Sequence, residues 1–154
     1  DLIGVEVCAA TKNIYSMLIG ASEGLSSNSL DNEIKHKYYL NTAASLAYKA
    51  VSEMKILTKK LNGKAETAYG LSGLGDLYVS SAGGRNSKMG YYLGQGHSFK
   101  EAKEKFMKDI TVEGADLVFE IGPKILKEFD KKEFKLLISV IESIYNNKKL
   151  EISW

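Results

Sequence analysis

The chain has 154 residues, of which 44% are hydrophobic and 26% charged, so it is long enough to bury a single core. Its 21 basic and 19 acidic residues leave a formal net charge of +2, which gives no overall field that would favour nucleic acid or a membrane surface. Any anion site must therefore be local. The single cysteine, Cys8, excludes an intramolecular disulfide, and the two separated histidines offer no metal-ligand cluster, so we expect a metal-free protein of a reducing cytoplasm.

The most apolar stretch lies near the start of the chain, around residues 14–25. Ser16, Ser22 and Glu23 interrupt it, and it falls short of the roughly 20 apolar residues that a membrane-spanning helix needs. We therefore expect no membrane span. The chain begins at Asp1 without a methionine, and no basic segment precedes an apolar run, so we expect a longer protein to extend upstream.

The long stretches without strict apolar/polar alternation favour helices, and no segment has the pattern of a strand. The first predicted helix covers about residues 5–22 and has apolar residues almost all round, which is typical of a buried helix. The second covers about residues 31–61, with apolar residues at three- and four-residue spacing, lysines on the opposite face and Gly63 as a stop.

Residues 70–96 differ from the rest, because eight of the fourteen glycines fall there. We expect loops and short helices in this stretch. A short helix should follow from Ser98 to Phe106, with Ser98 as N-cap and Glu101 at the capping-box position. Two further helices are expected near residues 115–129 and 133–145, so the predicted fold class is all-α.

Lys12 is the only charged residue between Val7 and Ser22, within the first predicted helix. Its ammonium is desolvated there unless it is paired, and a lysine held in that way can exchange a proton near neutral pH. Reduction of a carbonyl needs such a donor, because the carbonyl oxygen gains negative charge. The pattern alone leaves open a lysine that extends its ammonium to water, and the adjacent Asn13 favours a site only weakly.

Two glycine-containing motifs carry polar groups. The stretch from Gly70 to Leu77, GLSGLGDL, lets the backbone before Asp76 approach a ligand or a helix closely, although a plain loop explains it equally well. The stretch Gly83-Gly-Arg-Asn86 joins a turn to a guanidinium and an amide at an expected helix start, which suits phosphate but is also common surface chemistry. No G-x-G-x-x-G follows a strand, so the chain has no dinucleotide-binding fingerprint of its own.

One further motif, Gly20-Ala-Ser-Glu-Gly24, matches the G-x-S-x-G pattern of hydrolases. That pattern needs a strand before it and a helix after it, whereas here it lies at the end of a predicted helix. We therefore do not expect Ser22 to be a nucleophile.

Four sequence blocks occur in a family-specific order: IGVEVCAATKNIY from Ile3, GLSGLGDL from Gly70, GRN from Gly84 and VEG from Val112. Together they resemble the C-terminal half of NAD(P)-dependent glycerol-3-phosphate dehydrogenase, over Asp1 to about Ile125. The resemblance implies a helical domain like the C-terminal domain of 6-phosphogluconate dehydrogenase, occupying residues 1–154. It also implies an N-terminal Rossmann domain, absent from this chain, which binds NAD or NADP and meets the helical domain at the active site.

The resemblance further implies the reaction, an interconversion of sn-glycerol 3-phosphate and dihydroxyacetone phosphate for glycerophospholipid synthesis. Lys12 matches the catalytic general acid and base of the family. The positions that match substrate-binding residues are Lys12, Asn13, Asp76, Gly84, Arg85 and Asn86. The positions that match cofactor contacts are Arg85, Val112 and Glu113. No metal is implied, and the isolated chain is expected to be inactive because it lacks the domain that supplies the hydride.

Two departures from the family pattern stand out. Gly84 occupies a position where the family often has serine, in a loop that looks slightly shorter, so one hydrogen bond to phosphate could be lost. Residues 31–40 form a charged and aromatic stretch that is longer than in many relatives and could extend a helix or contact another subunit, as in a homodimer.

Two alternative functions remain at this stage. The chain could belong to a related dehydrogenase that acts on another hydroxy acid, in which case Arg85 and Asn86 would have no phosphate to bind. It could also be a non-catalytic helical interaction or dimerisation module, in which case Lys12 and Asp76 would tolerate alanine. The choice between NAD and NADP lies with the absent domain.

Overall fold

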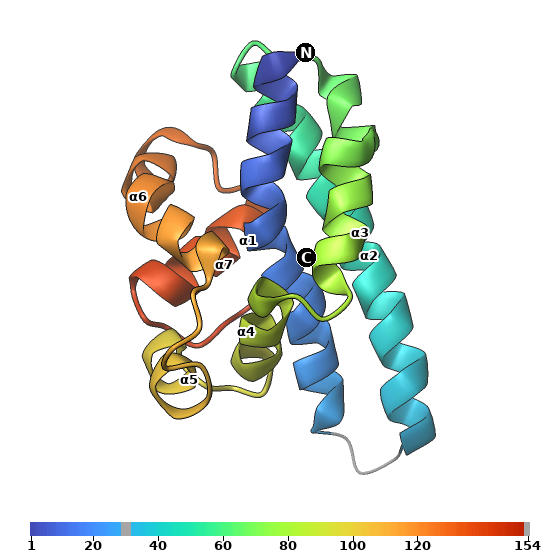
Figure 1. Cartoon of the computed structure of the whole chain (residues 1–154), viewed down its shortest axis with the longest axis vertical. Helices are drawn as coiled ribbons and strands as arrows, with labels where there is room; N and C mark the ends of the chain where they lie inside the picture. Colours follow the sequence, from blue (N-terminus) through green and yellow to red (C-terminus); the bar gives the residue numbers. More distant parts are fainter. Residues whose placement is uncertain (29–31, 153–154) are drawn as a thin grey trace.

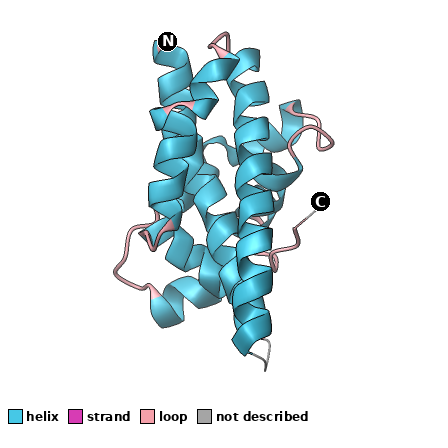
Figure 2. Cartoon of the chain, turned by 90° about the vertical axis from the view of Figure 1, so that its right-hand side faces the viewer, coloured by secondary structure: helices cyan, strands magenta, loops and turns pink. Residues whose placement is uncertain are grey.

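The computed structural model describes residues 1–28 and 32–152, without the side chains of residues 32–38. Over these residues the chain is helical and contains no strand, which confirms the all-α fold class (Figures 1 and 2). The elements are α1 (Leu2–Ser27), α2 (Asn32–Lys60), the 3-10 helix η1 (Ala65–Tyr69), the π-helix η2 (Leu71–Gly75), α3 (Asp76–Ser81), α4 (Arg85–Gly94), α5 (Phe99–Phe106), α6 (Glu113–Glu128) and α7 (Lys135–Tyr145).

Helix α1 is the centre of the structure and contacts α2, α3, α4, α6 and α7. Figure 1 shows it between α2 and α3 on one side and α6 and α7 on the other. Every residue from Ile14 to Ser22 is buried, as the sequence predicted, but Val5 is 44% exposed, so the prediction of burial is wrong for the first turns. The helix is also longer at both ends than the predicted 5–22.

The early start of α1 has a local cause. The Asp1 carboxylate caps the helix by accepting a hydrogen bond from the backbone N–H of Gly4 at 3.2 Å. The same carboxylate accepts hydrogen bonds from the Lys64 N–H and the Thr67 hydroxyl, each at 2.7 Å. One side chain therefore caps α1 and fastens it to the segment that follows α2.

By length and composition alone, α1 is long and apolar enough to cross a membrane, and half of its most apolar window is buried inside the protein. This differs from the sequence expectation, which considered only a shorter apolar run. The core helix of a globular domain meets the same criteria, and the packing of α1 against five other helices gives its apolar side chains such a role.

The remaining helices lie near their predicted positions. Helix α5 has the predicted capping box, in which the Glu101 carboxylate accepts from the Ser98 N–H at 2.9 Å. Helix α7 begins at Lys135 rather than at Glu133. Residues 70–96 form the expected short helices, η2, α3 and α4, with short connections between them. Of the stretch at residues 31–40, Asp31 and the side chains up to Tyr38 lie outside the described residues.

Helices α1 and α4 pack backbone to backbone through glycines on both of them. The contacts pair Gly20 with Ser87, Gly24 with Tyr91, Gly90 with Met17 and Gly94 with Ala21. From Gly20 to Gly24 on α1 the contact moves from Ser87 to Tyr91 on α4, so the two helices run parallel. The start of α4 therefore lies beside the middle of α1. The G-x-S-x-G stretch of α1 is therefore a packing surface.

A buried carboxylate on α2 holds the start of α7. Glu53 has no exposed surface and accepts hydrogen bonds from the N–H groups of Leu136 and Leu137, at 2.9 and 3.0 Å, and from the Tyr15 hydroxyl at 3.1 Å. The first N–H groups of a helix lack intrahelical partners and carry its partial positive charge, so a carboxylate there is favourable. Burial raises the pKa of Glu53, and these hydrogen bonds oppose part of the rise. Burial also raises the pKa of Tyr15 well above its usual value, which keeps its hydroxyl a donor.

We predict that Gly90→Ala lowers the free energy of unfolding by about 2–3 kcal/mol, because overpacking a tight contact costs this much. The added Cβ would lie 1.8 Å from the Met17 carbonyl oxygen, which is backbone and cannot rotate away. Urea denaturation followed by circular dichroism measures the change. In the control, Gly75→Ala, the new Cβ meets only the end of the exposed Leu71 side chain, and we expect a change within about 0.5 kcal/mol. Equal effects would contradict the packing explanation.

A second prediction concerns pH. Since the pKa of Glu53 is raised above its ordinary value of 4.5, the stability that this group contributes is fully present below pH 4.5 and is lost as the pH rises through the raised pKa. The Glu53→Gln variant lacks this titration. As the pH rises through this range, the native chain should therefore lose stability relative to Glu53→Gln. Denaturant titrations at half-unit pH steps would show it, and a constant difference would refute the prediction.

Candidate functional site

The residues predicted for a site come from α1 and from the starts of α3, α4 and α6. Asp76 is the first residue of α3, Arg85 of α4 and Glu113 of α6. Helix α6 reaches α1 through Gly114, where a Cβ would lie 2.7 Å from the Asn13 carbonyl oxygen. Helix packing thus places these three helix starts around the segment of α1 that carries Lys12. The N-terminal N–H groups of α4 and α6 favour an anion at this place.

Lys12 is paired with a carboxylate. Its ammonium lies 2.5 Å from the Asp76 carboxylate, and the two side chains are 17% and 41% exposed. The sequence left open a paired lysine or one that extends its ammonium to water, and in the structure Asp76 of the segment GLSGLGDL is its partner. The ion pair holds the ammonium at the edge of the buried part of α1, where a ligand can reach it.

Asn86 joins α4 to α6 with both ends of its side-chain amide. Its Oδ1 accepts a hydrogen bond from the Gly114 N–H at 2.8 Å, and its Nδ2 donates to the Glu113 carboxylate at 3.3 Å. Asn86 is only 6% exposed, whereas Arg85, which also pairs with Glu113, has a side chain that is 58% exposed. The Asn86 side chain is therefore engaged within the protein, and its backbone N–H in the first turn of α4 is the group that can face an anion.

The position of Gly84 explains the departure from serine. Gly84 is the N-cap of α4, and a Cβ there would lie 2.8 Å from the Ser80 carbonyl oxygen. The short connection from α3 to α4, with Gly83 at a left-handed φ of 104°, brings this carbonyl close. A side chain at position 84 would require the connection to move.

The two α6 residues predicted from the resemblance to contact the cofactor, Val112 and Glu113, differ in their exposure. Val112 as a whole is 2% exposed, and its carbonyl oxygen accepts hydrogen bonds from the N–H groups of Ala115 and Asp116, so the residue is engaged within the protein. Glu113, with a side chain that is 41% exposed, can reach a ligand directly. Sequence reasoning did not identify Gly114 as the contact between α6 and α1; the only signal was a glycine directly after an acidic residue at a helix start.

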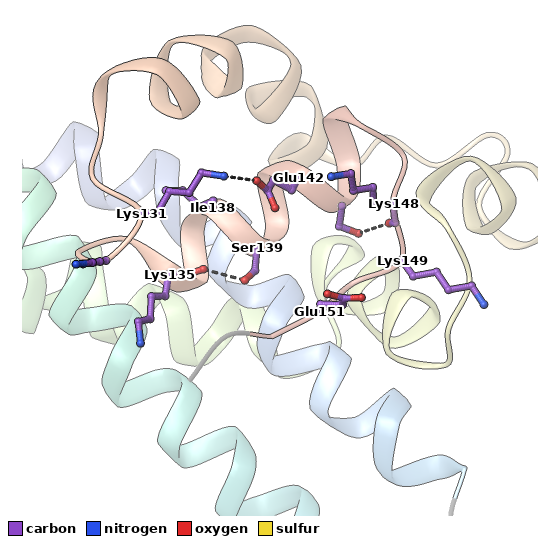
Figure 3. A pocket seen from close by; sticks show the side chains of 10 residues that line it. Lys131, Lys135, Ile138, Ser139, Glu142, Lys148, Lys149 and Glu151 are labelled. Atoms are coloured by element: carbon purple, nitrogen blue, oxygen red, sulfur yellow. Dashed lines mark hydrogen bonds and ion pairs between the residues drawn. The ribbon is translucent and has the colours of Figure 1, made fainter.

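A hollow separate from these residues lies along α7 and the segments that precede and follow it (Figure 3). Its volume is about 700 Å³, and it is bordered by five lysines and two glutamates, with Lys131 donating to Glu142 at 2.7 Å. None of the residues predicted for the site lines it.

In the part of the chain that the structure describes, no group of three or more His, Cys, Asp or Glu side chains could hold a metal ion.

The family model described as NAD-dependent glycerol-3-phosphate dehydrogenase C-terminus matches residues 1–153. The chain belongs to this family. The NADP(+)-dependent glycerol-3-phosphate dehydrogenase of Archaeoglobus fulgidus is 36% identical over 156 residues, which cover 98% of this chain and 43% of the relative. A glycerol-3-phosphate dehydrogenase [NAD(P)+] of Lactobacillus delbrueckii is 31% identical over 95% of this chain and 39% of the relative.

Solved structures of the glycerol-3-phosphate dehydrogenase family agree with this assignment. The enzyme of Coxiella burnetii superposes with a TM-score of 0.76 at 30% identity, over 97% of this chain and 42% of that one. The yeast enzyme superposes with a TM-score of 0.78 at 22% identity, which supports the fold alone. The family and the helical fold inferred from the sequence are confirmed. The chain spans less than half the length of these relatives.

We predict that Asn86→Ala lowers the free energy of unfolding by about 1–3 kcal/mol, because it leaves the buried N–H of Gly114 without its acceptor. Arg85→Ala should cost less than about 1 kcal/mol, since it removes an exposed ion pair to the same Glu113. Parallel urea titrations compare the two variants. A larger loss for Arg85→Ala would mean that the ion pair, rather than the amide, joins α4 to α6.

Proposed function

We propose that residues 1–154 form the substrate-binding domain of an NAD(P)-dependent glycerol-3-phosphate dehydrogenase, following a Rossmann domain that binds NAD or NADP. The whole protein would interconvert sn-glycerol 3-phosphate and dihydroxyacetone phosphate in the cytoplasm, for glycerophospholipid synthesis. The observation that supports this most strongly is the Lys12–Asp76 pair, 2.5 Å apart, at the place where the starts of α4 and α6 meet α1. A proton donor thus lies near an anion site.

Lys12 acts as general acid and base. When bound, the nicotinamide supplies or accepts the hydride at C2 of the substrate. During reduction, the Lys12 ammonium donates a proton to the carbonyl oxygen as that oxygen gains negative charge, and in the reverse direction the amine takes the proton from the C2 hydroxyl. Asp76 orients the ammonium through their ion pair, and Asn13, one residue further along α1, contributes to the same substrate surface.

The start of α4 holds the phosphate. Arg85 offers a guanidinium, which suits bidentate bonding to phosphate oxygens, and the N–H groups of the first turn, including that of Asn86, have no partner within the helix. Gly84 leaves this approach free of a side chain. The Glu113 carboxylate pairs with Arg85, so a bound phosphate would take the place of this internal anion.

The residues at the start of α6 suit a contact with the cofactor. The exposed Glu113 carboxylate can accept hydrogen bonds from hydroxyl or amide groups, and Arg85 can reach in the same direction. Val112, which is 2% exposed, supports this contact as the N-cap of α6. The formation of a homodimer and the absence of a membrane span in the whole protein remain predictions.

The test follows NADH absorbance with dihydroxyacetone phosphate, using the protein extended through its upstream reading frame. We expect the extended protein to oxidise NADH and the chain of residues 1–154 to be inactive. Lys12→Ala and Lys12→Arg should each lower kcat by about 10²–10⁴-fold, which is the usual contribution of a general acid. Lys12→Arg is informative because arginine keeps the positive charge beside Asp76 but does not give up a proton.

The exposed Lys108 provides the control, and Lys108→Ala should retain full activity. Full activity of Lys12→Arg would show that only the charge is needed and would remove the acid–base role. An extended protein that ignores dihydroxyacetone phosphate but reduces another keto acid would support the related dehydrogenase instead. If it reduces no substrate, and Lys12 and Asp76 tolerate alanine, the chain is an interaction module.

A further inference from the structure

One face of α7 forms the floor of the hollow that lies apart from Lys12, which we call the α7 hollow (Figure 3). The α7 residues that line it recur at three- and four-residue spacing, which places them on one face of the helix: Lys135, Ile138, Ser139, Glu142 and Ser143. The opposite face is buried, and α7 contacts α1, α2 and α6. The floor of the hollow is therefore the outer face of a core helix.

The turn before α7 brings two lysines to this floor. Asp130 closes the turn by accepting a hydrogen bond from the Lys132 backbone N–H at 2.9 Å. The ammonium of the neighbouring Lys131 lies 2.7 Å from the Glu142 carboxylate, two turns along α7. Both lysines line the hollow, and the backbone that carries them is held by these contacts.

The segment after α7 folds back and brings two more lysines. The Ser143 hydroxyl donates to the Lys148 carbonyl oxygen at 3.0 Å, so the chain returns along the helix that it has just left. The Asn147 side chain accepts a hydrogen bond from the Lys100 backbone N–H at 2.9 Å, which fastens the same segment to α5. Lys148 and Lys149 are exposed and line the hollow. In Figure 3 they lie across Ser139 and Glu142 from Lys131 and Lys135.

The α7 hollow carries most of the positive charge of the protein. Its lining includes five lysines and two glutamates, which gives an excess of three positive charges. The rest of the chain has 16 basic and 17 acidic residues and therefore a formal net charge of −1. One of the two glutamates, Glu142, is already paired with Lys131. The small net charge of the whole chain thus conceals a local basic site.

The chemistry of this lining suits a multivalent anion. Each lysine ammonium has three donors and no acceptor, and lysine binds phosphate as a point charge. The lysines come from α7 and from the segments on both sides of it, so a single phosphate would meet only some of them. The volume of about 700 Å³ lies within the range of about 300–1,000 Å³ that small-molecule sites have.

We propose that the α7 hollow binds a small molecule that carries a polyphosphate group, through the ammonium groups of Lys132, Lys148 and Lys149. Such a group has the three or more negative charges that match the excess of the hollow. The hollow is a concave site, which favours a small molecule over a flat membrane surface. The proposal does not depend on the proposed function, because none of the residues assigned to substrate or cofactor lines the hollow.

Lysine acetylation tests the site, with inorganic tripolyphosphate as the probe. The protein extended through its upstream reading frame is treated with an N-hydroxysuccinimide ester of acetate, with and without tripolyphosphate, at an ionic strength matched with sodium chloride. Mass spectrometry of the peptides gives the rate at each lysine. We expect tripolyphosphate to slow the reaction of Lys132, Lys148 and Lys149 by about threefold or more, because an ammonium held by an anion is less often the reactive amine.

Three exposed lysines outside the hollow provide the internal control: Lys105, Lys108 and Lys127. Their rates should not change. Unchanged rates at the hollow lysines, or equal protection at the control lysines, would overturn the proposal. Equal protection of the hollow by inorganic phosphate at the same ionic strength would overturn the polyphosphate assignment.

A matched pair of variants then tests the role of charge. Lys148→Ala should raise the tripolyphosphate concentration that half-protects Lys132 and Lys149 by about threefold or more, because one charge-assisted contact is lost. Lys108→Ala removes the same charge elsewhere and should leave this concentration unchanged. Equal effects would mean that only the net charge matters and would overturn the proposal.

Two further arms separate the other anion sources. Arg85→Ala should leave the protection of the α7 hollow unchanged, since Arg85 belongs to the anion site proposed at α4; loss of protection in this variant would overturn the assignment to α7. Phosphatidylglycerol vesicles replace tripolyphosphate in the last arm. If the vesicles protect the three lysines and tripolyphosphate does not, the partner is a membrane surface and the proposal is wrong.

Discussion

Helices α1 and α4 lie so close together that the carbonyl groups of each face the glycines of the other. At Gly90 a single added carbon would come within 1.8 Å of the Met17 carbonyl oxygen, and at Gly94 within 2.1 Å of the Ala21 carbonyl oxygen. Such an approach requires small residues on both helices, and it fixes both the direction and the register of α4 relative to α1. The start of α4 therefore lies near Lys12, and the proposed anion site beside the proposed proton donor depends on a contact further along the two helices.

Other contacts extend the same arrangement. Gly114 allows α6 to touch the backbone of α1 at Asn13, and the Asn86 side chain then bonds the start of α6 to the start of α4. Elsewhere in the core, the Glu53 carboxylate accepts hydrogen bonds from the Tyr15 hydroxyl and from the start of α7. The residues proposed to meet substrate are thus held by buried neighbours, while the groups that would exchange partners, Arg85 and Glu113, remain exposed. Rigid support beneath exposed charged groups suits a site that has to bind and release an anion.

The domain is polar around its site and apolar beside it. The Lys12–Asp76 pair is only partly exposed, yet the first turns of α1 and an apolar groove between α1 and α6 present apolar surface to solvent. An apolar surface of this kind loses the unfavourable contact with water when another unit covers it. Covering it would also lower the local dielectric around Lys12, and charge–charge and hydrogen-bond interactions strengthen under those conditions. A unit that covers this apolar surface would therefore stabilise the protein and strengthen the interactions of the Lys12 ammonium.

The sequence by itself determined the helical class and most helix positions, and it indicated which residues we propose for the site. Helical periodicity and caps are local properties, as the capping box at Ser98 illustrates, and Lys12 stood out because it is the only charged residue between Val7 and Ser22. The family resemblance supplied the chemistry, and the comparisons confirmed the family.

Only the tertiary structure decided how those residues meet. The sequence predicted loops and short helices for the glycine-rich stretch at residues 70–96, but not which of its glycines would lie inside a helix, because glycine has a low helix propensity. In the fold, Gly90 and Gly94 lie inside a helix, where the close contact with α1 offsets their low helix propensity. The pairing of Lys12 with Asp76, the engagement of the Asn86 side chain and the burial of Val112 likewise join residues distant along the chain. Sequence periodicity reports which face of a helix is apolar, but the choice of neighbour and register depends on shape complementarity between surfaces, which exists only once the helices have packed.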